Sequence, residues 1–166
     1  MAIVQLLLPE LDRELGLTRR ILERVPLEDG MWKPHDKSMS MGRLSSHVAE
    51  LFLWAQAVLE TDEFDITQQA AARPVCATRE ELLSLFDTSG AKARELLAPK
   101  TDAEMLGTWT FKKEGKVLFS MPRVAAFRNF ILNHAIHHRG QLSVYLRLKD
   151  VPVPSIYGPS ADEATL

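Results

Sequence analysis

The sequence contains only one cysteine among its 166 residues, Cys76. An intrachain disulfide is therefore excluded. Because no histidine lies near Cys76 in the sequence, we predict a bystander thiol and not a catalytic nucleophile. A near absence of cysteine suits a reducing compartment, and the stretch MAIVQLLLPELDRE shows no secretory pattern. We expect a cytoplasmic protein.

Long apolar runs and an excess of basic residues are also lacking. No apolar stretch approaches the roughly 20 residues that cross a bilayer, so no membrane-spanning segment is expected. The 20 Lys and Arg residues are interspersed among 22 Asp and Glu residues, for a formal net charge of −2. This charge pattern gives no basic stripe for a phosphate backbone and argues against nucleic-acid and membrane-surface binding.

Apolar residues at helical spacing dominate what is present. Four amphipathic helices are predicted, namely Ile3 to about Val25, Ser40 to about Glu60, Thr78 to about Pro99, and Pro122 to about Lys149. Alternation around KKEGK predicts a short β-hairpin at about residues 108–120. The proline-rich end, VPVPSIYGPSADEATL, should be an extended tail. We predict an all-α fold with one domain over residues 1–166, a four-helix bundle with long crossover connections.

Histidines interrupt two of the apolar stripes. His134 and His138 are four residues apart in the last predicted helix, so both side chains project from one face. His47 lies in the apolar stripe of the second predicted helix in the same way. Facing helices of a bundle often build metal sites from inward side chains. The spacing therefore predicts that His47, His134 and His138 converge on one divalent ion.

Three neutral imidazoles suit zinc or nickel and leave coordination positions open, as catalytic sites do. An ion with open positions acidifies a bound water or thiol and so supplies a nucleophile at neutral pH. The alternative is that these histidines are hydrogen-bonded core residues or a polar patch at a dimer seam. Ala135 stands where the zincin motif HExxH has its glutamate, so peptide hydrolysis is not implied.

The expected roles of three other polar residues follow from their positions in the sequence. Glu50, one helical turn after His47, is a candidate for a partner of a metal ligand or a general base, and an exposed flanking glutamate is the alternative. His137 points about 100° away from His138, where it would orient a neighbouring ligand or meet another helix. We expect His35, in a connector that contains proline, at the surface.

Two stretches resemble the DinB family of metal-dependent enzymes. They are WKPHDKSMSMGRLSSHVAE and, far downstream, NHAIHHRGQLSVYLRLKDVPVPSIYGPSADE, and the resemblance covers nearly the whole chain. It implies a four-helix bundle, frequently dimeric, with zinc or nickel on a three-histidine site that matches His47, His134 and His138. Relatives with known activities use low-molecular-weight thiols, either to open electrophiles such as epoxides or to isomerise maleylpyruvate. The family name carries no implication of DNA binding.

The leading hypothesis is a metal-dependent transferase or hydrolase in which the ion activates a thiol or water against a small electrophile. The alternative is a non-catalytic helical bundle that is stapled by the metal and binds a partner in a stress response. A structural site normally has four protein ligands, and the sequence offers three good candidates. A fourth ligand, such as Glu50 or His137, would favour the structural alternative.

Overall fold

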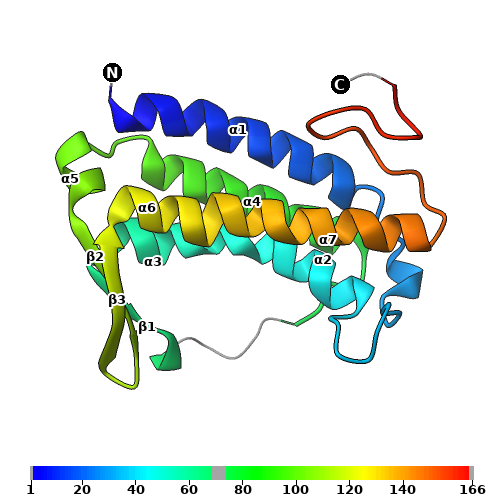
Figure 1. Cartoon of the computed structure of the whole chain (residues 1–166), viewed down its shortest axis with the longest axis horizontal. Helices are drawn as coiled ribbons and strands as arrows, with labels where there is room; N and C mark the ends of the chain where they lie inside the picture. Colours follow the sequence, from blue (N-terminus) through cyan, green and yellow to red (C-terminus); the bar gives the residue numbers. More distant parts are fainter. Residues whose placement is uncertain (1, 69–73, 165–166) are drawn as a thin grey trace.

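The computed structural model describes residues 2–68 and 74–164 and is mostly helical with one small sheet (Figure 1). The α-helices are α1 (Ile3–Leu22), α2 (Met41–Glu50), α3 (Trp54–Glu60), α4 (Arg79–Leu97), α5 (Asp102–Leu106), α6 (Arg123–Phe127) and α7 (His134–Leu148). Three 3₁₀ turns are η1 (Leu27–Asp29), η2 (Leu51–Leu53) and η3 (Ile66–Gln68), and η4 (Arg128–Asn133) is a π-helix. The strands are β1 (Glu63–Asp65), β2 (Thr108–Lys113) and β3 (Lys116–Pro122).

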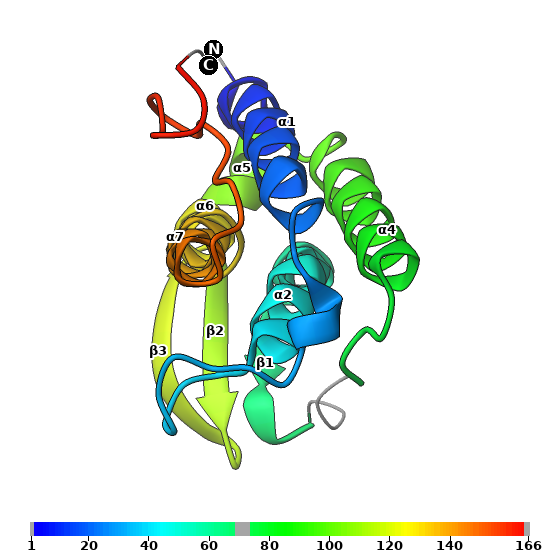
Figure 2. The same ribbon diagram turned by 90° about the vertical axis from the view of Figure 1, so that its right-hand side faces the viewer.

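The long helical segments pack along one another, as the end view shows (Figure 2). Helix α4 contacts α1, α2 and α3, and α7 contacts α1 and α2. Their facing apolar side chains form one cluster of buried residues, in which Phe52, Trp109 and Phe127 are among the largest. Burial of this apolar surface is the main force that holds the helices together. No helix in the described ranges is both long enough and apolar enough to span a bilayer.

The four predicted helical segments are confirmed, but two of them are interrupted. The segment that begins after Ser40, whose Oγ accepts a hydrogen bond from the Arg43 N–H at 3.3 Å, is broken by η2 between α2 and α3. The last segment passes through the π-helix η4 before α7 begins at His134. Both interruptions lie on the helices that carry the candidate histidines, and π-helical turns are frequent at functional sites.

The predicted hairpin is confirmed by antiparallel pairing of β2 with β3. Glu114 and Gly115 both have positive φ, 52° and 74°, which is the backbone that a two-residue hairpin turn requires. The Asp65 carboxylate accepts hydrogen bonds from the backbone N–H groups of these residues, at 3.2 Å and 2.6 Å. Strand β1 thereby caps the hairpin turn while it pairs in parallel with β2.

An all-α class is therefore too narrow, because the three strands form a sheet in the order β1-β2-β3. Neither strand β1 nor helix α5 was predicted. Thr101 starts α5 with a capping box, in which its hydroxyl accepts from the Glu104 N–H and the Glu104 carboxylate accepts from the Thr101 N–H. Residues 69–73 of the aperiodic connector before α4 lie outside the described residues.

The tail after α7 has no regular secondary structure, as predicted, and lies beside α1 and α7 (Figure 2). Glu163 forms ion pairs with Arg20 of α1 and with Arg24, which follows that helix, and its carboxylate accepts the Ser155 backbone N–H at 2.9 Å. Tyr157 reaches between α1 and α7, where its hydroxyl donates to Glu14 at 2.7 Å. The tail is therefore part of the packed structure.

Candidate metal centre

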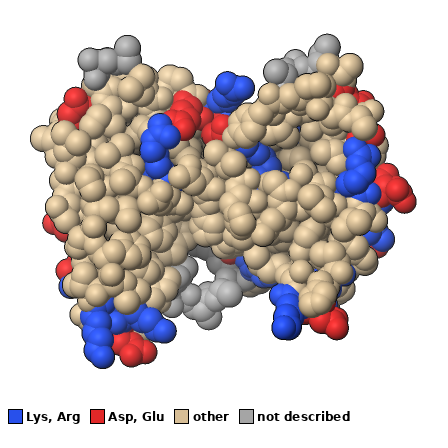
Figure 3. All heavy atoms as spheres, in the orientation of Figure 1, with Lys and Arg blue, Asp and Glu red and all other residues tan. Residues whose placement is uncertain are grey.

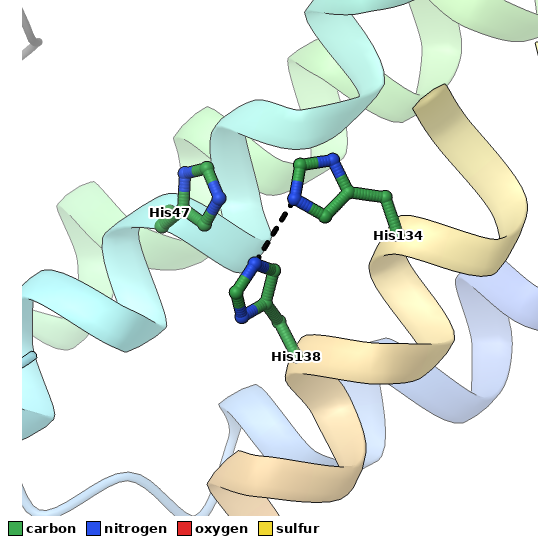
Figure 4. Close-up of side chains that lie close together, drawn as sticks. All are labelled: His47, His134 and His138. Carbon is green, nitrogen blue, oxygen red and sulfur yellow. Dashed lines mark hydrogen bonds between the residues drawn. The ribbon is translucent and has the colours of Figure 1, made fainter. Parts of the chain in front are cut away.

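The three predicted histidines come together from two segments that are far apart in the sequence. His47 lies in the last turn of α2, His134 is the first residue of α7, and His138 follows one turn later. Figure 4 shows the three rings directed toward one another across the gap between the two helices. One ligand atom from each residue lies within 4.8 Å of the others. The convergence that the stripe pattern predicted is therefore present.

The imidazole rings are close enough to share one ion. The Nε2 atoms of His134 and His138 are 3.0 Å apart. The ring centroid of His47 lies 5.3 Å from that of His134 and 4.6 Å from that of His138. His138 is buried, with 8% of its surface exposed, while His47 and His134 are half-buried. The cluster is thus partly shielded and still reachable from solvent.

Each ring has a hydrogen-bond partner on the nitrogen that faces away from the cluster. Glu50 Oε1 lies 3.2 Å from Nδ1 of His47, and Gln141 Oε1 lies 2.7 Å from Nδ1 of His138. The backbone carbonyl of Phe130 accepts a hydrogen bond from His134, whose Nδ1 is the nitrogen left for it because Nε2 faces His138. Oxygens of this kind accept, so each Nδ1 carries the proton and each Nε2 presents a lone pair.

Burial favours the neutral form of His134 and His138. Burial lowers the pKa of His138 to about 4, against an upward effect of its hydrogen bond to Gln141. The pKa of His134 is also lowered, first by burial and then by the neighbouring His47. A neutral imidazole is the form that binds a metal ion.

The donor set fits a divalent transition-metal ion. The Nε2 atoms of His134 and His138 face each other at 3.0 Å, a distance at which one donates to the other unless both rings carry their proton on Nδ1. Two lone pairs at that distance repel unless a cation lies between them or beside them. With His47, they form a cluster of three nitrogen ligands that could hold a metal ion, and nitrogen ligands suit zinc and nickel.

The structure also places the other polar residues singled out in the sequence. Glu50 is beside the cluster, where its Oε1 accepts from Arg43 and from His47. Its Oε2 is buried and has no hydrogen-bond partner among the described residues. His137 lies 3.1 Å from the Gln141 amide nitrogen through its Nε2. His35 is exposed as predicted, and Cys76 is half-buried in the connector before α4.

One residue and one helical segment at this centre were not assigned a role from the sequence. Gln141 lies in the downstream stretch that carries the family resemblance and was given no role of its own, yet it is the partner of His138. Its position three residues after His138 was the available signal, because residues at that spacing are neighbours on a helix. The π-helix η4, which precedes His134, has no signal in composition or periodicity.

An aromatic cluster adjoins the histidines on the side of the sheet. Trp54 of α3 lies 5.3 Å from Phe130 of η4 between ring centroids, so these rings meet across the same two segments that carry the histidines. Phe64 and Phe111 of the sheet extend the cluster, each in contact with Trp54. Figure 3 shows this face of the molecule indented at the middle of its lower edge, with charged residues of both signs lying mostly toward the margins.

Comparisons with known proteins found one matching family and one similar curated protein. The model of the DinB family matches residues 3–165 of the chain. The uncharacterized protein YrdA of Bacillus subtilis is 27% identical over 153 residues, which cover 90% of this chain and 85% of the relative.

Two solved structures are similar in fold, each with 20% sequence identity. A DinB-like protein from Bacillus cereus has a TM-score of 0.75, with 94% of this chain and 98% of that chain covered. A DinB-like protein from Bacillus subtilis has a TM-score of 0.67, with 87% of this chain and 94% of that chain covered. The likeness to these structures shows a shared fold.

Proposed function

The chain belongs to the DinB family, and on this basis we propose that it is a metal-dependent enzyme acting on small electrophiles. His47, His134 and His138 would hold one divalent ion, with zinc or nickel as the metal. The reaction class is transfer of a low-molecular-weight thiol to the electrophile, or its hydrolysis by water. The observation that carries this proposal is the convergence of three imidazoles from two helices, with each Nδ1 already hydrogen-bonded.

An open coordination position supports catalysis over a structural metal site. Within residues 2–68 and 74–164, the cluster contains these three histidines and no fourth His, Cys, Asp or Glu. Neither of the two candidates for a fourth ligand belongs to this cluster: Glu50 Oε1 accepts from His47 and Arg43, and His137 contacts Gln141. Structural zinc sites are closed by four protein ligands, whereas catalytic ones leave a position for water or substrate.

We propose separate roles for the bound ion, for Glu50 and for the aromatic cluster. A bound divalent ion supplies Lewis acidity, which makes a thiol or water acidic enough to lose its proton near pH 7. Glu50 holds His47 through Oε1, and we assign its unpartnered Oε2 as the acceptor of that proton. The aromatic cluster of Trp54, Phe64, Phe111 and Phe130 would bind the apolar part of the electrophile.

The choice of a thiol as cosubstrate rests on the resemblance to thiol-using DinB proteins. We propose that the four long helical segments form the family's four-helix bundle and that the protein acts in the cytoplasm. A homodimer and a role in a stress response remain predictions from the resemblance and the sequence. Light scattering coupled to size-exclusion chromatography measures the oligomeric state directly.

An activity screen tests the catalytic proposal. Metal-free protein is loaded with zinc or nickel and incubated with a panel of low-molecular-weight thiols and small electrophiles, including epoxides, and thiol loss and hydrolysis products are measured. We expect turnover that requires the metal and falls by at least about 100-fold in Glu50→Gln, as general-base catalysis contributes roughly that much. Metal-loaded wild type that turns over no member of the panel would favour the non-catalytic helical bundle.

A further inference from the structure

Three hydrogen-bond partners of the cluster lie among the described residues, namely Glu50, Phe130 and Gln141. Of these, only Gln141 leaves open which nitrogen of its histidine carries the proton. The Glu50 carboxylate and the Phe130 carbonyl can only accept, so they leave His47 and His134 a single choice of tautomer. A primary amide presents either an oxygen that accepts or an NH₂ group that donates. The orientation of the Gln141 amide therefore determines the tautomer of His138.

The two orientations have opposite consequences for the cluster. With Oε1 toward His138, at 2.7 Å, the proton is on Nδ1 and the Nε2 lone pair faces His134 and His47. With the NH₂ group in its place, His138 Nδ1 would have to accept, and the proton would move to Nε2. That proton would occupy the direction of the ion and remove His138 as a ligand.

His137 supports the first orientation. The Gln141 amide nitrogen lies 3.1 Å from His137 Nε2, one turn back along α7, and donates to it when His137 carries its own proton on Nδ1. Gln141 is an exposed residue, and water would otherwise compete for both ends of its amide. The contact with His137 gives the side chain a second fixed point. It also places His137, which is no part of the histidine cluster, in a chain of contacts that ends at His138.

We propose that Gln141 is a positioning residue for the metal centre: its Oε1 holds His138 in the tautomer that presents Nε2, and His137 holds the Gln141 amide in the required orientation. This inference rests on the proposed metal site. Hydrogen-bond partners of metal-bound histidines fix ring orientation and raise ligand basicity, and their loss weakens metal binding by roughly 10- to 100-fold.

The test compares four forms of the full chain. Gln141→Leu removes both ends of the amide, whereas Gln141→Glu keeps an acceptor for His138 and loses the donor to His137. Gln56→Leu makes the same glutamine-to-leucine change at another exposed helical position, in α3, and is the matched control. Zinc affinity is measured by competition with a chromophoric chelator. The His138 Nδ1–H proton of the zinc-loaded protein is followed by ¹H–¹⁵N NMR.

We expect Gln141→Leu to bind zinc at least about tenfold more weakly than wild type, with the His138 Nδ1–H signal broadened by exchange with water. Gln141→Glu should restore the affinity to within about threefold of wild type and keep the signal, and Gln56→Leu should match wild type in both readouts. A packing role alone would not produce rescue by glutamate.

Two results would overturn the proposal, and they differ in what else they overturn. If wild type binds zinc and Gln141→Leu binds it within about twofold with its His138 Nδ1–H signal intact, Gln141 has no positioning role and the proposed function stands. If wild type binds no zinc, the proposed function and the role of Gln141 fail together.

Discussion

Arg139 of α7 and Glu14 of α1 form an ion pair in the protein interior, with 2.7 Å between Nη2 and Oε2 and 2% and 4% of the residues exposed. Arg139 also donates to Thr18 Oγ1 at 3.1 Å and to the Tyr157 hydroxyl at 2.6 Å. Both terminal nitrogens of Arg139 and the Oε2 atom of Glu14 therefore have partners within the protein, which offsets the cost of burying the two charges. Arg139, the residue after His138, thus joins α7 to α1 and to the tail.

Breaking this pair should destabilise the protein strongly. Arg139→Met leaves the Glu14 carboxylate buried without its cation, so we expect a loss of about 3–5 kcal/mol in the free energy of unfolding, measured by urea denaturation. Arg128→Met removes a more exposed ion pair between η4 and α1, Arg128 with Glu10, and should cost less than about 1 kcal/mol. Similar losses in the free energy of unfolding in both variants would contradict a special contribution of the buried pair of Arg139 and Glu14.

The tail should loosen when its anchor on α1 is neutralised. Glu163 accepts the Ser155 N–H and pairs with Arg20 and Arg24, so Glu163→Gln weakens three contacts at once. We expect faster hydrogen–deuterium exchange across residues 153–163 than in wild type, with α4 unchanged as the internal reference. Equal exchange rates in the tail would show that these ion pairs do not hold it.

Asp65 gives the hairpin a defined acid dependence. Hydrogen bonds from Thr67 and from the backbone of Gly115 and Thr67 lower its pKa from 3.8 to about 2. Because the folded-state pKa is depressed, the stability that Asp65 contributes is present above about pH 4 and is lost as the pH falls through about 2. Carboxyl NMR should give a midpoint near 2 for Asp65, and a midpoint near 4 would contradict the turn contacts. Asp65→Asn should remove this titration.

Metal binding should stabilise the fold by an amount that grows with the logarithm of the free metal concentration relative to the dissociation constant. An ion that binds only the folded state at 100 times its dissociation constant adds about 2.7 kcal/mol to the free energy of unfolding. We expect zinc to raise the unfolding midpoint of wild type and to leave that of His134→Ala unchanged. An equal rise in both would indicate zinc binding elsewhere on the chain.

The histidine cluster could be predicted from sequence because its geometry follows from helical periodicity. His134 and His138 share a face through their spacing of four, and His47 lies in the apolar stripe of a helix that had to face the same interior. The helix starts near Ser40 and Thr78 could also be predicted from local sequence, because each of these side chains caps its own helix.

Features that depend on residues far away in the sequence could not be predicted from local patterns. Glu14 lies on the buried face of α1, where periodicity gives no reason for a carboxylate, and its explanation is Arg139 from the other end of the chain. Strand β1 has three residues and is defined by its pairing with β2. Three residues are too few to show a local alternation of apolar and polar side chains. The π-helix η4 differs from an α-helix in hydrogen bonding, which residue spacing over six positions cannot reveal.

The most direct test of the metal centre is the number of divalent ions per chain, measured by native mass spectrometry on protein reloaded with zinc or nickel. Wild type and His35→Ala, which changes an exposed histidine outside the cluster, should carry one ion each. His47→Ala, His134→Ala and His138→Ala should carry none at the same free metal concentration. One retained ion in all three cluster variants, or none in wild type, would contradict a metal centre on these histidines.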